Sequence, residues 1–93
     1  MQVHGELDLA GVRCVRDGLL QAAAAAAGHE LTVDLRPTTY LASAGIALLV
    51  EADRTVRAAG GRLRLLVAPA DVVRRALALS GVDDLLELHD ADG

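Results

Sequence analysis

A strand pattern followed closely by a helix pattern occupies the middle of the chain. Apolar and polar residues alternate from Leu31 to Leu35, which is typical of a strand with one buried face. After a short loop, apolar residues recur at helical spacing from Ser43 to about Ala59, and the pair Gly60–Gly61 ends the predicted helix. Ser43 therefore lies at the beginning of that helix, where backbone N–H groups are unpaired and the helix dipole is positive.

The same alternation of strand and helix patterns continues on both sides of this segment. The further predicted elements are a strand end at Met1–Glu6, a helix from Asp8 as N-cap to Gly28, a strand at Leu63–Val67, a helix from about Pro69 to Gly81 and a short strand at Leu85–Leu88. This order predicts βαβ units and a largely parallel sheet. Because polar residues such as Asp34 and Arg64 alternate with the apolar ones, we expect helices on one face only. If the two strands are neighbours, Asp34 can pair with Arg64 on the open face.

Composition favours a small protein-binding domain. The 93 residues suffice for one domain, predicted to span 1–93, and the net charge of -4 does not favour nucleic acid or anionic membranes as partners. The lone Cys14 excludes an intramolecular disulfide and suits a reducing compartment. No apolar run has the length of a membrane span, so we expect a cytoplasmic protein without membrane insertion.

The residues that carry metal or catalytic chemistry do not gather in the sequence. The three histidines, His4, His29 and His89, lie in different segments, and their spacing does not match a metal-ligand set. Ser43 has no nearby histidine and lacks the glycine pattern of a nucleophile elbow. Gly60–Gly61 follows a helix, whereas a phosphate-binding loop precedes one. We therefore expect no metal, no cofactor and no enzymatic activity.

A set of short motifs, in order along nearly the whole chain, resembles the STAS domain of bacterial anti-sigma factor antagonists. These motifs are Gly5-Glu6-Leu7-Asp8, Thr32-Val33-Asp34-Leu35, Leu41-Ala42-Ser43-Ala44-Gly45, Ala59-Gly60-Gly61 and Ser80-Gly81-Val82-Asp83-Asp84-Leu85. The resemblance implies an α/β sandwich whose parallel or mixed sheet of about four strands carries helices on one face. Family members continue well before the Gly-Glu-Leu-Asp segment, whereas this chain begins four residues before it, so the edge strand of the family is missing from this sequence. Either the start of the chain is assigned too late, or the sheet is short. A sheet edge exposed in this way would allow pairing with a second copy.

The resemblance further implies a function in transcription regulation. Typical members bind an anti-sigma factor that is also a serine kinase, and the kinase phosphorylates a serine that matches Ser43, which breaks the interaction. Family members usually have Asp-Ser-Ser-Gly at this site, whereas Ala42 and Ala44 flank Ser43 here. Ser43 is also predicted to be the helix N-cap, and the two roles are compatible.

The expected partner-binding residues lie around the starts of the first two helices. They are Asp8, Ser43, Ala44, Ala47 and Leu48. An exposed Leu48 would be an apolar anchor for the partner, and the alternative interpretation assigns it to the core. The alternative function is a STAS scaffold without a switch, or an accessory subunit of a lipid ABC transporter in which the domain binds the ATPase. Ala42 and Ala44 favour this alternative.

Overall fold

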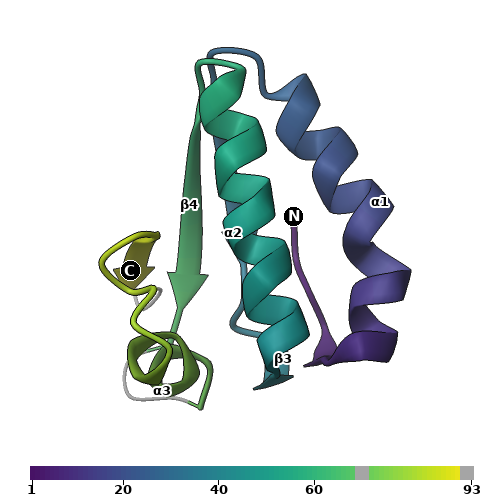
Figure 1. Ribbon diagram of the computed structural model, residues 1–93, viewed down its shortest axis with the longest axis vertical. Coiled ribbons are helices and arrows are strands. Elements are labelled where there is room, and N and C mark those ends of the chain that lie inside the picture. Colours follow the sequence, from purple (N-terminus) through teal and green to yellow (C-terminus); the bar gives the residue numbers. More distant parts are fainter. Residues whose placement is uncertain (69–71, 91–93) are drawn as a thin grey trace.

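The computed structural model describes residues 1–68 and 72–90 and has the predicted alternation of strands and helices (Figure 1). Its elements are β1 (Gly5–Leu7), α1 (Leu9–Ala25), β2 (Glu30–Asp34), β3 (Thr38–Leu41), α2 (Ser43–Ala58), β4 (Arg62–Val67), α3 (Val72–Leu79) and β5 (Glu87–Asp90). Strand β3 was not predicted, and β5 begins two residues later than the predicted strand at Leu85–Leu88. Pro69, the predicted start of the last helix, lies outside the described residues.

All strand pairs between these elements are parallel, which confirms the predicted class of fold. One sheet has the order β2-β4-β5, and β1 pairs with β3 beside it. The first residues of the chain connect the two groups, because the Val3 N–H donates to the Asp34 carbonyl (3.1 Å) and the Asp34 N–H donates to the Met1 carbonyl (2.7 Å). The strands therefore form a nearly continuous layer.

Helices α1 and α2 lie side by side over one face of this layer (Figure 1). The core between helices and strands is almost entirely aliphatic. Helix α3 contacts β3 and contributes Val73 and Leu77 to that core. The largest fully buried side chains are those of Leu7, Leu19, Leu35, Leu48, Leu49, Leu63, Leu65, Leu77, Val3, Val33, Val56 and Val67. Tyr40, the single aromatic residue, is outside the core and 51% exposed.

The open face of the sheet carries ion pairs, but the predicted pair between Asp34 and Arg64 is wrong. The β2–β4 register places Arg64 opposite Thr32, so Arg64 binds Glu30 at 3.0 Å instead. The Asp34 carboxylate accepts hydrogen bonds from the Arg36 Nε (2.9 Å) and from its terminal nitrogen (2.7 Å). These bonds hold the pKa of Asp34 well below its usual range.

Candidate functional site

Strands β1 and β3 end next to each other, and each leads directly into a helix. Leu7 pairs with Leu41 at the ends of the two strands, and α1 and α2 begin within two residues of them. Because the strands are parallel, both helix starts lie at the same edge of the domain (Figure 1). Asp8 and Ser43 therefore share one edge, as the sequence predicted.

Asp8 is the N-cap of α1, which confirms the prediction. Its backbone is extended (φ -95°, ψ -168°), and its Oδ1 accepts a hydrogen bond from the Gly11 N–H at 2.9 Å. This bond satisfies one of the unpaired N–H groups of the first helical turn. The carboxylate is thus used by the fold, and it also adds negative charge at this edge.

Ser43 is not the N-cap of α2, so that prediction is wrong. The chain leaves β3 in an extended conformation and stays extended through Ala42 (φ -89°, ψ 172°), which makes Ala42 the cap residue. Alanine has no side-chain acceptor, so α2 has no side-chain cap. Ser43 is the first helical residue, its side chain is exposed, and its hydroxyl forms no hydrogen bond to the residues that the structure describes.

Two glycines fix how closely the helix starts approach β1. A Cβ atom on Gly45 would lie 2.4 Å from the Leu7 carbonyl oxygen, and one on Gly11 would lie 2.1 Å from the Glu6 carbonyl oxygen. Any side chain at either position would force the helix away from the strand. These glycines therefore hold the two helix starts, and Ser43 with them, directly against the end of β1.

The surface around these helix starts combines small and apolar side chains. Ser43 and Ala47 are exposed and Ala44 is half-buried, but Leu48 is only 1% exposed and belongs to the core. The predicted role of Leu48 as a surface anchor is therefore wrong, because α2 packs against α1 as well as against the strands and buries a wide face.

Two exposed apolar residues that the sequence interpretation missed lie on the elements of the same edge. They are Leu9, the first residue of α1, which is 60% exposed, and Tyr40 in β3. The sequence contained two signals for these residues: Leu9 directly follows an N-cap residue, and Tyr40 is the single aromatic residue of the chain. We use the name helix-start edge for the residues at or next to the starts of α1 and α2, which are Asp8, Leu9, Tyr40, Ser43, Ala44 and Ala47.

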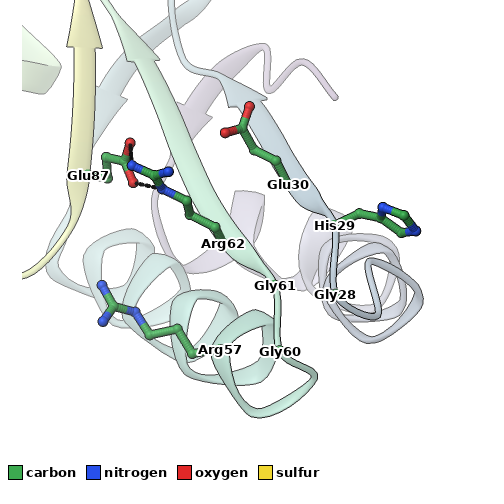
Figure 2. Close-up of a pocket in the computed structure, with 8 residues that line it drawn as sticks. All are labelled: Gly28, His29, Glu30, Arg57, Gly60, Gly61, Arg62 and Glu87. Carbon is green, nitrogen blue, oxygen red and sulfur yellow. Dashed lines mark hydrogen bonds and ion pairs between the residues drawn. The ribbon is translucent and has the colours of Figure 1, made fainter.

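A shallow pocket of about 550 Å³ lies at the other end of the strands, where α1 and α2 end (Figure 2). Its charged groups largely neutralise each other. The Arg62 guanidinium donates two hydrogen bonds to the Glu87 carboxylate, at 2.6 and 2.8 Å. These bonds, together with the hydrogen bond between His89 and Glu87, lower the pKa of Glu87 to about 2. The His29 ring points away from the paired groups in Figure 2. The lining residues are Gly28, His29, Glu30, Arg57, Gly60, Gly61, Arg62 and Glu87.

Neither a metal centre nor a membrane span occurs in the described part of the chain. Within residues 1–68 and 72–90, no three histidine, cysteine or carboxylate side chains gather closely enough to hold a metal ion. In the same residues no helix has both the length and the apolar character needed to cross a bilayer.

Comparison with known proteins relates the whole fold to one family. The family model described as Mlab, STAS domain, matches residues 1–87. No curated protein matches the sequence. A solved structure, that of the anti-sigma factor antagonist SpoIIAA in its unphosphorylated form, superimposes with a TM-score of 0.74 at 24% identity, over 97% of this chain and 76% of that chain. At 24% identity, this structural similarity shows that the two proteins share a fold.

Proposed function

Because the chain belongs to the STAS-domain family, we propose that it is an anti-sigma factor antagonist, which binds an anti-sigma factor that is also a serine kinase. The observation that carries this proposal is the exposed, hydrogen-bond-free hydroxyl of Ser43 at the start of α2. The role is binding in the cytoplasm rather than catalysis, and it regulates transcription by releasing a sigma factor from its inhibitor.

The helix-start edge has the properties of a protein-binding surface. Leu9 and Tyr40 are large apolar side chains that remain at least half exposed, as anchor residues of interfaces are before binding. Ala44 and Ala47 are small, so a partner can approach the first turns of α2 closely. A partner seated here would cover Ser43 directly.

Phosphorylation of Ser43 would act as the switch for this interaction. A phosphoryl group adds about -1.5 to -2 charges at neutral pH. The domain tolerates that charge, because α2 begins without a side-chain cap and its first N–H groups favour an anion. A bound partner does not tolerate it, because binding at the helix-start edge would bury the charged phosphoryl group. The fold stays intact while the affinity falls.

The two serines of the chain provide a direct test. We expect incubation with candidate anti-sigma serine kinases and ATP to raise the intact mass by about 80 Da, the mass of one phosphoryl group. Ser43→Ala should abolish the increase, and Ser80→Ala, which changes the chain's other serine, should preserve it. The proposal fails if no kinase modifies the wild-type protein or if Ser43→Ala is still modified.

A second candidate function is that of a STAS scaffold without a switch, or of an accessory subunit that binds the ATPase of a lipid ABC transporter. Two observations favour it: Ala42 and Ala44 replace the polar residues usual in antagonists, and the matching family model carries the description Mlab, STAS domain. This function predicts co-purification with a transporter ATPase and an affinity for it that Ser43→Ala leaves unchanged.

A further inference from the structure

Arg57, in the last turn of α2, is held by a buried carboxylate. Asp53 lies one turn earlier on α2 and is only 3% exposed, and its Oδ2 forms an ion pair with the Arg57 Nε at 3.0 Å. Within residues 1–68 and 72–90, the two terminal nitrogens of Arg57 have no hydrogen-bond or ion-pair partner, although most of the side chain is exposed. The guanidinium is therefore fixed at one nitrogen, and its other N–H donors remain free.

The stability of the fold does not account for this ion pair. Taking the Asp53 carboxylate out of water costs free energy, and an ion pair with an exposed partner recovers only part of it. A positive charge in the last turn of α2 is favourable without any buried acid, because the helix dipole is negative there. The buried carboxylate instead fixes the direction in which the free N–H groups of Arg57 point.

The fixed guanidinium lies at the pocket where α1 and α2 end (Figure 2). It extends to the same side of β4 as the Arg62–Glu87 pair, whereas His29 lies on the other side. Gly28 and Gly60 have φ values of 83° and 80°, a region that favours glycine, so their part of the lining stays free of side chains. The volume of about 550 Å³ is within the roughly 300–1,000 Å³ of small-molecule sites.

We propose that this pocket binds a small molecule through a carboxylate or phosphate group, which the free N–H groups of Arg57 contact. A guanidinium with two free terminal nitrogens offers the planar fork that such oxyanions accept in a bidentate contact. The carboxylates of the pocket lining do not compete for it. Glu87 is bound by Arg62, and Glu30 is bound by Arg64. Because the helix-start edge lies at the opposite end of the strands, the pocket stays accessible while a protein partner is bound there.

Titration of the full chain with small oxyanions tests this site without any partner protein. Inorganic phosphate and acetate are each added to about 50 mM near neutral pH and compared with chloride at equal ionic strength. Both should shift the amide resonances of Gly60 and Gly61 and the Nε–H resonance of Arg57 in a saturable way, with dissociation constants of about 1–10 mM. A saturable response to either anion supports the site, and the tighter of the two shows which group it prefers.

Three variants separate the assigned contact from general electrostatics. Arg57→Gln should raise the dissociation constant at least about 10-fold, whereas Arg54→Gln, which removes an exposed arginine of α2 outside the pocket lining, should change it by less than about twofold. Asp53→Asn should also weaken binding although it removes a negative charge, because the guanidinium is then no longer fixed. Circular dichroism verifies folding, and the double variant Asp53→Asn/Arg57→Gln takes the place of Arg57→Gln if that variant does not fold.

Several outcomes would overturn the proposal. Phosphate and acetate could shift the resonances no more than chloride does, or the shifts could be confined to the first turn of α2, which would place the anion at the other end of the helix. The site is also refuted if the variant without Arg57 binds as tightly as the wild type. Tighter binding by Asp53→Asn would show that charge alone attracts the anion. These measurements involve neither a kinase nor Ser43, so they are independent of the test of the proposed function.

Discussion

Replacing Gly45 with alanine tests the close approach that positions the start of α2. The added Cβ atom would lie 2.4 Å from the Leu7 carbonyl oxygen and 2.8 Å from the Leu7 Cγ and Leu41 Cδ1 atoms. The side-chain atoms can shift a little, but the carbonyl oxygen belongs to the backbone at the end of β1. The helix start must therefore move away from the strand, and the core around Leu7 loses contacts.

The magnitude follows from two opposing effects. Alanine in place of glycine favours a helix by about 1 kcal/mol, whereas overpacking a core costs about 1–3 kcal/mol and more where backbone must move. We expect Gly45→Ala to lower the free energy of unfolding by about 2 kcal/mol. Gly18→Ala in α1 is the matched control, because apart from its chain neighbours and the backbone of its own helix, no described atom lies within 4 Å of its Cβ position. The control should raise the free energy of unfolding by up to about 1 kcal/mol.

Urea denaturation monitored by circular dichroism measures both variants. In a domain of this size, a loss of 2 kcal/mol corresponds to a melting temperature lower by roughly 8–16 °C. Opposite signs for Gly45→Ala and Gly18→Ala would support the described contact between α2 and β1. If Gly45→Ala were as stabilising as the control, the start of α2 would not lie against the end of β1.

Four further substitutions test the two helix starts and one ion pair. Ala42→Asp supplies the missing cap of α2 and should raise the free energy of unfolding by about 1 kcal/mol, whereas Asp8→Ala should lower it by a similar amount, both measured by urea denaturation. Ser43→Ala should change it by less than about 0.5 kcal/mol, and a larger loss would show that the hydroxyl supports the fold. The hydrogen bonds from Arg62, and then the one with His89, lower the pKa of Glu87 from 4.5 to about 2, so the stability from these interactions is present above about pH 5 and is lost as the pH falls toward 2. Thermal melts at low salt should show a weaker dependence in this pH range for Glu87→Gln, and an unchanged dependence would contradict the pairing.

Helical periodicity and cap residues were sufficient to predict most of the elements but not β3. The segment Thr38–Leu41 directly follows Pro37 and is short, so the sequence alone indicates a loop. Its strand conformation depends on pairing with β1, a segment far away in the sequence. Contacts of this kind cannot be inferred from local patterns.

The errors at the candidate site have similar causes. The cap of α2 falls one residue before Ser43, because the conformation at the end of β3 decides where the helix begins. Leu48 is buried because α2 contacts α1 as well as the strands, and helical spacing alone does not tell how wide the buried face is. The shared edge of Asp8 and Ser43 could be predicted because parallel strands fix it.

A protein partner bound at the helix-start edge would lie over Ala47 and leave the far end of α2 uncovered, and paired affinity measurements distinguish these two positions. Ala47 and Ala58 are exposed alanines near opposite ends of α2. Ala47→Arg places a large, charged side chain at the helix-start edge, and Ala58→Arg places the same side chain far from it. We would titrate both variants and the wild type by isothermal calorimetry against the proposed partner, an anti-sigma serine kinase. We expect Ala47→Arg to weaken binding at least about 100-fold, while the affinity of Ala58→Arg stays within about threefold of the wild type. Equal affinities for the two variants, or a larger loss for Ala58→Arg, would contradict binding at the helix-start edge.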